Sequence, residues 1–173
     1  MGRINKSFTV RAGGVQVRSV GKVDSGADVS LVRLDIGRRL GIDPATSDVI
    51  AVGGIGNQRT VGFSLPATIE IDGSEAKLDL AVPVGTVDAR GHLTTFEQKN
   101  NLIGHDFLQA TGARLDFSEG RGRFVAGKCT QRVDDVELLK ITPREERALR
   151  AWMIRNLSPR RKRKTRMTRK RSG

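Results

Sequence analysis

Three adjacent residues, Asp24, Ser25 and Gly26, are those whose types best suit catalysis. They come after a strand-like segment in which residues 15–20 alternate between apolar and polar side chains. Glycine lets the backbone bend closely, so the carboxylate of Asp24 is expected on a tight turn at the end of that strand. Asp, Ser and Gly are also ordinary turn formers, so an exposed turn without chemistry is the alternative interpretation.

A carboxylate in this position needs a second carboxylate beside it to share acid and base roles. The sequence Asp-Ser-Gly or Asp-Thr-Gly occurs once in the chain. A pair built in this way would therefore require a second copy of the chain.

Other kinds of site are poorly supported by the sequence. His92, His105 and Cys129 are too few and too far apart to predict a metal site, and we expect neither a metal nor a cofactor. Gly54-Ile55-Gly56 begins like a dinucleotide-binding loop, but Arg59 occupies the third glycine position and strand-like residues follow. No apolar run approaches the ~20 residues needed to cross a bilayer, so no membrane association is expected. A single cysteine excludes an internal disulfide and suits a cytoplasmic or other reducing compartment.

Turn residues divide the first 126 residues into short strand-like segments. Gly13-Gly14 and Asp72-Gly73 each predict a hairpin, and residues 48–61 predict a third hairpin with a glycine-rich tip. Closely spaced strands with little helix favour an all-β fold, here a small closed β-barrel with one short helix over 105–110. The remaining expected elements are strands over 28–32, 63–66, 67–71, 76–82, 101–104, 114–117 and 123–126, about two helical turns over 34–40, and a long surface loop over 84–100.

The C-terminal part has a different composition. Residues 144–173 contain 13 Lys or Arg and 2 Glu, and so account for 11 of the 12 net positive charges. Thr142, Pro143 and Glu145 predict a capped helix start, and Ser158-Pro159 ends that helix. We therefore expect a main domain over 1–127, a helical appendage over 128–158 and a disordered basic tail over 159–173.

Four motifs, taken in order, resemble those of the retroviral-type (retropepsin-like) aspartic proteases. The resemblance spans residues 7–126 and is specific in combination, although each motif alone is weak. The motifs are Val23-Asp24-Ser25-Gly26-Ala27-Asp28 as the active-site loop, Val52-Gly53-Gly54-Ile55-Gly56 as the flap, Asn101-Leu102-Ile103-Gly104-His105-Asp106-Phe107-Leu108 as the supporting strand and helix, and Ala113-Arg114-Leu115-Asp116-Phe117 as the strand after it.

The resemblance implies an aspartic endopeptidase that works as a homodimer on a protein or peptide substrate. Asp24 from each chain would form the catalytic dyad, Ser25 would hydrogen-bond across the two-fold axis, and the Gly26 carbonyl would accept a substrate amide. Substrate binding would further involve Ala27, Asp28, Gly53, Gly54, Ile55 and Gly56, and the supporting residues would be Leu102, Ile103, Gly104 and His105. The alternative is a dimer of the same fold that binds peptide or nucleic acid with weak or no catalysis.

Two residues depart from the family pattern. Lys22 stands where an apolar residue is usual; it could change substrate preference, stabilise ionised Asp24, or extend its ammonium into solvent. His105 stands where the family commonly has an arginine that pairs with the acid matching Asp28, so a pH-dependent dimer is a hypothesis. The basic run over 160–171 is consistent with non-specific nucleic-acid binding, a solvated extension or, in a eukaryote, nuclear import.

Overall fold

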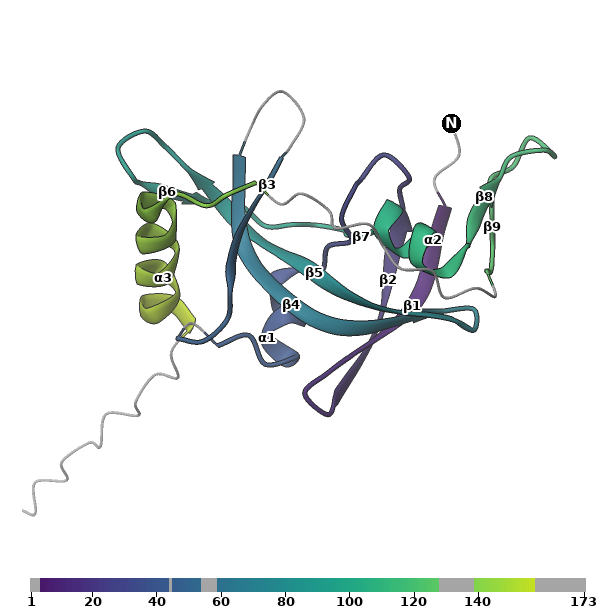
Figure 1. The fold of residues 1–173 in the computed structure, drawn as a ribbon, viewed down its shortest axis with the longest axis horizontal. Helices are drawn as coiled ribbons and strands as arrows, with labels where there is room; N and C mark the ends of the chain where they lie inside the picture. Colours follow the sequence, from purple (N-terminus) through teal and green to yellow (C-terminus); the bar gives the residue numbers. More distant parts are fainter. Residues whose placement is uncertain (1–3, 44, 54–58, 128–138, 158–173) are drawn as a thin grey trace, which may run out of the picture.

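The computed structural model describes residues 4–43, 45–53, 59–127 and 139–157 (Figure 1). Within them the chain is mostly β-structure with three helices. The elements are β1 (Ile4–Ala12), β2 (Val15–Val23), α1 (Leu34–Arg39), β3 (Val49–Gly53), β4 (Arg59–Ile71), β5 (Ser74–Val87), β6 (Leu93–Thr95), β7 (Asn101–Ile103), α2 (His105–Thr111), β8 (Arg114–Asp116), β9 (Arg123–Val125) and α3 (Pro143–Leu157).

Seven strands form one sheet in the order β6-β5-β4-β1-β2-β7, and β3 also pairs with β4. All pairings are antiparallel except that of β2 with β7. The long strand β4 has β5 along one edge and shares its other edge between β3 and β1. The outermost strands, β6 and β7, are three residues each and do not pair with one another, and β8 with β9 makes a separate two-stranded sheet. The expectation of a closed barrel is therefore wrong for the described residues, which form two sheets.

The predicted turns are confirmed. Gly13 and Gly14 join β1 to β2 with positive φ angles of 54° and 79°. Asp72 and Gly73, at 49° and 83°, join β4 to β5. Two positive φ angles in succession are the backbone of a tight hairpin turn, which Gly, Asn and Asp adopt most readily.

Three details differ from the expectation. Residues 59–71 form one strand in which Pro66 lies between the part paired with β3 and the part paired with β1. The segment 84–100 is not wholly a loop, because β5 runs on to Val87 and β6 pairs with it. Residues 28–32 make only isolated bridges, through Leu31 to Ala81 and Leu102.

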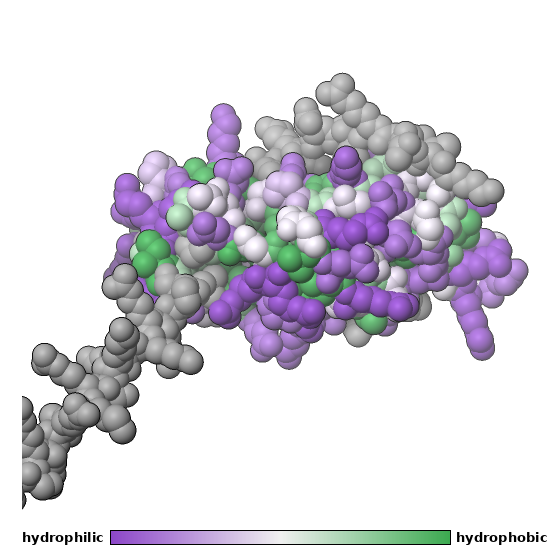
Figure 2. All heavy atoms as spheres, turned by 90° about the horizontal axis from the view of Figure 1, so that it is seen from below, coloured by the Kyte–Doolittle hydropathy of each residue, from purple (hydrophilic) through white to green (hydrophobic). Residues whose placement is uncertain are grey.

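The core is mostly aliphatic, includes the rings of Phe8, Phe63, Phe107 and Phe124, and continues beneath α3. Fully buried side chains come from β1, β4, β5, β7, α2 and α3: Val10, Phe63, Ile69, Leu80, Ile103, Phe107, Leu149 and Met153. Hydrophilic side chains predominate on the face seen in Figure 2, with only small apolar patches between them. The large hydrophobic residues that remain exposed are few and scattered among the described residues: Val15, Val20, Phe96, Phe117, Leu139 and Ile154.

Helix α3 begins as its sequence predicts. The Thr142 N–H donates to Glu145 Oε2 at 2.7 Å, and the Glu145 N–H donates to Thr142 Oγ1 at 3.2 Å, which makes a complete capping box. The helix packs against β4, β5 and β6 through Leu149 and Met153 (Figure 1). The predicted domain boundaries at 127 and 158 stay predictions.

Candidate active site

Asp24 lies directly after β2, at the point where two parallel strands end side by side. Residues 21–23 of β2 pair with residues 101–103 of β7, and the Asp24 N–H donates to the Ile103 carbonyl at 2.9 Å. The predicted active-site loop and the predicted supporting strand are thus in direct contact. Both contribute backbone that fixes where the Asp24 side chain leaves the sheet.

The Asp24 carboxylate has two partners within its own chain. Its Oδ2 lies 2.5 Å from Lys22 Nζ, and its Oδ1 accepts a 3.2 Å hydrogen bond from the Gly26 N–H. The Lys22 hydrogen bond holds the pKa of Asp24 below its usual value; the Gly26 bond acts in the same direction, whereas partial burial opposes it. With 31% of its side chain exposed, Asp24 is an ionised carboxylate that solvent can reach.

The loop after Asp24 is held by the start of α2. The His105 N–H donates to the Ala27 carbonyl at 2.7 Å, and the Asp106 N–H donates to the Asp28 carbonyl at 3.2 Å. The first N–H groups of a helix have no partner within the helix, so this contact satisfies them while it fixes the loop. A further bond, from the Ala27 N–H to the Asp24 carbonyl at 3.1 Å, closes the turn itself.

Gly104 permits this close approach. A Cβ atom at position 104 would lie 2.7 Å from the Ala27 oxygen, 2.7 Å from the Val29 carbonyl carbon and 2.9 Å from the Ser30 nitrogen. All three are backbone atoms, which cannot move aside as a flexible side chain can. The glycine predicted to support the site is therefore required by contact, because any side chain would displace the loop.

A buried polar pair, Ser30 and Asp106, lies beneath the loop. Ser30 Oγ donates to Asp106 Oδ1 at 2.6 Å and accepts from the Gly104 N–H at 2.9 Å, while Asp106 Oδ2 accepts from the Ser30 N–H at 2.8 Å. Asp106 is 4% exposed, and burial raises its pKa, although its hydrogen bonds from Ser30 and Phe107 act against the rise. These hydrogen bonds tie the loop to α2 from the inside.

Neither Ser30 nor Asp106 was assigned its own role from the sequence. The two residues are 76 positions apart, so no local pattern connects them. One feature of the sequence could have indicated that Asp106 is buried: it lies in a largely apolar segment, between Leu102-Ile103-Gly104-His105 and Phe107-Leu108. An Asp inside such a run must either be exposed or be satisfied by hydrogen bonds.

The other predicted site residues lie in different surroundings. Ser25, Gly26 and Asp28 are exposed, and neither Ser25 nor Asp28 makes a side-chain hydrogen bond within the described part of the chain. Gly53 is exposed at the end of β3, whereas Gly54, Ile55 and Gly56 lie outside the described residues. Leu102 is half-buried on β7 beside Lys22.

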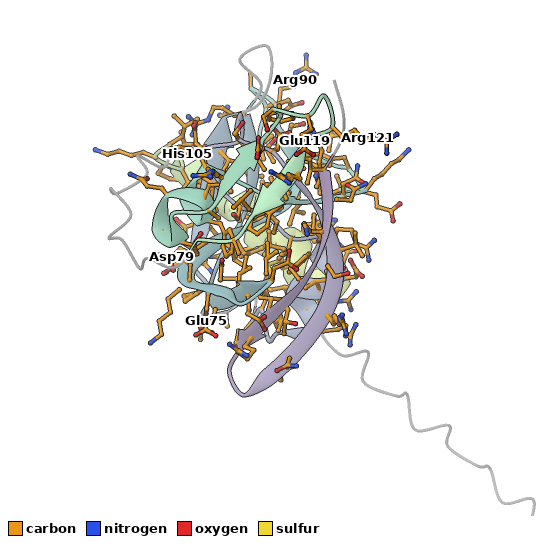
Figure 3. All side chains as sticks on the ribbon, turned by 90° about the vertical axis from the view of Figure 1, so that its right-hand side faces the viewer. Glu75, Asp79, Arg90, His105, Glu119 and Arg121 are labelled. Atoms are coloured by element: carbon orange, nitrogen blue, oxygen red, sulfur yellow. The ribbon has the colours of Figure 1, made fainter. Side chains whose placement is uncertain are left out.

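His105 joins the site through its backbone. Its side chain is exposed at the start of α2 (Figure 3), and in the described ranges no hydrogen bond or ion pair links the imidazole to Asp28. The hypothesised His105–Asp28 pair is therefore absent from the single chain as described.

The two arms of the predicted flap, β3 and β4, form the expected antiparallel hairpin, with Gly53 opposite Arg59. In Figure 1 these arms and the loop after β2 reach toward the same, upper side of the molecule. The arms of the hairpin are attached to the C-terminal segment close to the tip: Arg59 makes two hydrogen bonds to Glu145, at 2.8 and 3.1 Å, and Leu139 bridges Ala51.

Glu145 is largely buried and ionised in its ion pair with Arg59. Its side chain is 9% exposed. Burial raises the pKa of Glu145, but its hydrogen bonds from Arg59 and Thr142 outweigh burial and bring the pKa below its usual value. The ion pair therefore connects the start of α3 with the residue at which β4 begins.

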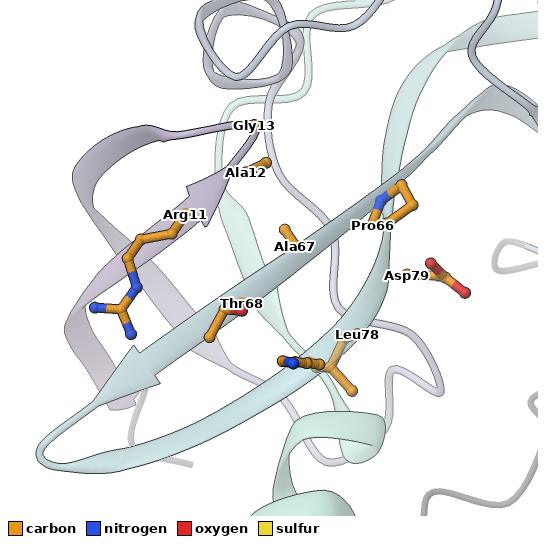
Figure 4. Close-up of a pocket in the computed structure, with 9 residues that line it drawn as sticks. Arg11, Ala12, Gly13, Pro66, Ala67, Thr68, Leu78 and Asp79 are labelled. Atoms are coloured by element: carbon orange, nitrogen blue, oxygen red, sulfur yellow. The ribbon is translucent and has the colours of Figure 1, made fainter.

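Other features of the described residues do not compete with this site. No group of three or more His, Cys, Asp or Glu side chains gathers there in a way that could hold a metal ion. No helix in the described ranges combines the length and the apolar character needed to cross a bilayer. A cavity of about 420 Å³ over β1, β4 and β5, lined among others by Arg11, Thr68 and Asp79 (Figure 4), contains no predicted site residue.

Comparison with known proteins gave matches at the level of structure alone. No protein-family model and no curated protein matched the chain. Among solved structures, the chain is similar to EIAV protease in complex with the inhibitor HBY-793, with 22% sequence identity, a TM-score of 0.45, and coverage of 66% of this chain and 92% of that one. A likeness with so low an identity and TM-score gives no information about function, which must be inferred from the residues of this chain.

Proposed function

We propose that the chain is an aspartic endopeptidase whose active site is completed by a second copy of itself. The observation that supports this proposal is the setting of Asp24: a solvent-accessible carboxylate directly after the buried last residue of β2, on a loop fixed by Ile103, Gly104 and α2. Such rigid placement is what a catalytic carboxylate requires, whereas an exposed turn has no need of it.

In the proposed dimer the two Asp24 carboxylates face one another across the two-fold axis. Like charges a few Å apart cannot both ionise cheaply, so the pair shares one proton and titrates as a unit. The ionised member activates a water molecule, and the protonated member polarises the carbonyl of the scissile peptide bond. One Asp24 per chain makes the dimer necessary.

The surrounding residues take the roles that their positions allow. The exposed Ser25, Gly26 and Asp28 would contact the partner chain or the main chain of an extended substrate. The hairpin of β3 and β4 would cover the substrate and exclude water from the dyad. Gly104 and the Ser30–Asp106 pair would keep the dyad in position without touching substrate.

The Lys22–Asp24 ion pair favours a second candidate, a dimer that binds peptide without efficient catalysis. An ammonium group at 2.5 Å stabilises the ionised carboxylate and so disfavours the shared proton of a dyad. Under the first proposal, the Lys22–Asp24 ion pair must rearrange when the dimer forms, because two ammonium groups then lie close to two carboxylates that share one proton. Activity therefore distinguishes the two candidates.

The test compares the wild-type protein with Asp24→Asn on a fluorescently labelled unfolded protein at several pH values between about 4 and 8, with and without pepstatin. Asp79→Asn, which removes an exposed carboxylate on β5, is the matched control. We expect hydrolysis by the wild type and by Asp79→Asn, and none by Asp24→Asn. Equal hydrolysis by all three would contradict the protease, and hydrolysis by none, with peptide binding retained, would favour the second candidate.

A further inference from the structure

A polar cavity of about 460 Å³ is lined in part by Lys22, the residue that pairs with Asp24. The Nζ of Lys22 lies 2.5 Å from Asp24 Oδ2. The other lining residues come from β1, β2, β7 and the segments next to them: Asn5, Ser19, Val20, Gly21, Arg33, Lys99, Asn100 and Asn101. A ligand group in this cavity would therefore contact Lys22, the residue that pairs with the proposed catalytic carboxylate.

The lining of the cavity is cationic. Three of its nine residues, Lys22, Arg33 and Lys99, carry positive charge, and none of the nine carries a carboxylate. Arg33 is neutralised by a two-point contact with Asp35, at 2.9 and 2.7 Å. Lys99 has no ion pair or hydrogen bond among the described residues, which leaves its ammonium group available to a ligand.

The floor of the cavity is a buried amide that is fixed on all sides. Asn101 is 2% exposed; its Oδ1 accepts from the Arg33 N–H at 2.9 Å, and its Nδ2 donates to Ser19 Oγ at 3.1 Å and to the Val20 carbonyl at 2.9 Å. A side chain satisfied in this way keeps one orientation, so the cavity is preformed.

The balance of charges in the proposed dimer indicates which charge a ligand of the cavity would carry. Two chains would bring two Lys22 ammonium groups to a dyad that carries one negative charge when it holds its shared proton. One ammonium group is then left without a partner, and Lys99 adds another positive charge on each side. A negative charge supplied by the substrate would pair with these groups and would leave the shared proton on the dyad.

We infer that this cavity binds a carboxylate side chain of the substrate, so that the enzyme prefers peptides with Glu or Asp close to the cleaved bond. This inference rests on the proposed function and names its substrate class. Lys22 and Lys99 are the specificity-determining residues, and Asn101 is a positioning residue. Carboxylates bind ammonium groups in partly desolvated sites through charge-assisted hydrogen bonds, which are stronger than neutral ones.

The test uses two peptide libraries that differ only in Glu against Gln at the positions flanking the cut bond. The wild type is expected to show a kcat/KM for its best Glu peptide about tenfold above that of the matched Gln peptide, as a charge-assisted contact would provide. Lys99→Met should reduce this ratio to about one to three. Lys77→Met, which removes an exposed lysine of β5, should leave the ratio unchanged.

A binding measurement makes the result independent of turnover. The same two peptides are titrated into Asp24→Asn protein and into Asp24→Asn/Lys99→Met protein. The inference is supported if Asp24→Asn protein binds the Glu peptide more tightly than the Gln peptide and Asp24→Asn/Lys99→Met protein binds the two peptides equally. Equal cleavage of Glu and Gln peptides by an active wild type would overturn the inference and leave the proposed function standing. Absence of cleavage would count against the proposed function, and equal binding of both peptides would then overturn the inference as well.

Discussion

Replacement of Ser30 by alanine tests whether the buried pair beneath the loop holds the site together. The hydroxyl makes two hydrogen bonds, a donation to Asp106 Oδ1 at 2.6 Å and an acceptance from the Gly104 N–H at 2.9 Å. Ser30 itself is 0% exposed, so water cannot take the place of the lost hydroxyl without rearrangement. The substitution therefore leaves one buried N–H without its partner and removes one of the hydrogen bonds of a buried carboxyl group.

The expected loss of stability follows from those two bonds. A neutral hydrogen bond contributes about 0.5 to 1.5 kcal/mol and one to a charged group about 1.5 to 3 kcal/mol, so the free energy of unfolding should fall by about 2 to 4 kcal/mol. With a urea m-value of about 2 kcal/mol per molar, the unfolding midpoint should fall by about 1 to 2 M.

The loss should also depend on pH. Burial raises the pKa of Asp106, so the folded state holds this proton more tightly than the unfolded state, and stability decreases as pH rises from about 4 through the folded pKa. The Ser30 hydroxyl opposes that rise, so its removal raises the pKa further. The destabilisation should therefore be larger at neutral pH than below about pH 4, where Asp106 is protonated in both states.

Urea unfolding followed by circular dichroism, at acid and neutral pH, measures both effects. Ser64→Ala is the matched control, because Ser64 is a half-buried serine on β4 whose side chain has no hydrogen bond among the described residues. The same unfolding midpoint for Ser30→Ala and Ser64→Ala at neutral pH would show that the Ser30–Asp106 pair does not stabilise the fold.

Three further predictions concern the residues around the site. Gly104→Ala should lower the free energy of unfolding by about 1 to 3 kcal/mol and reduce proteolytic activity, because the Cβ of alanine would meet three backbone atoms. Urea unfolding and a hydrolysis assay measure the two effects, and full activity would contradict the prediction. Lys22→Met should raise the pKa of Asp24, since the Lys22 hydrogen bond is the largest cause of its lowering; NMR titration of the carboxyl carbon measures the shift, and the acid limb of the activity profile should move to higher pH. In Arg59→Met the largely buried Glu145 loses its cation, so the free energy of unfolding should fall by about 1 to 3 kcal/mol. Hydrogen exchange should increase in β3, β4 and the start of α3, and exchange unchanged from wild type would show that the ion pair does not hold these segments together.

The sequence was informative where structure depends on neighbouring residues. The turns at Gly13-Gly14 and Asp72-Gly73, and the cap of α3 by Thr142 and Glu145, involve residues within a few positions of each other, and all were predicted. The strand that delivers Asp24 is of the same kind, because its alternation is a local pattern.

Contacts between distant residues could not be predicted in this way. Ser30 with Asp106 and Arg59 with Glu145 are 76 and 86 positions apart, and only the folded chain brings them together. Closure of the sheet likewise depends on how far the outer strands extend, which composition does not determine. For Lys22 the residue type allowed either a solvent-directed ammonium or a pair with Asp24, and the structure shows the pair.

The central claim is that each active site uses one Asp24 from each of two chains, and a mixing experiment tests it most directly. Wild-type protein at fixed concentration is equilibrated with increasing amounts of Asp24→Asn protein, and hydrolysis of a labelled unfolded protein is measured. Random pairing into dimers predicts that activity falls to about half with an equal amount of variant and to about a tenth with a ninefold excess. Wild-type activity that is unaffected by the excess, although untagged wild-type protein co-purifies with an affinity-tagged Asp24→Asn chain and so forms mixed dimers, would contradict the account.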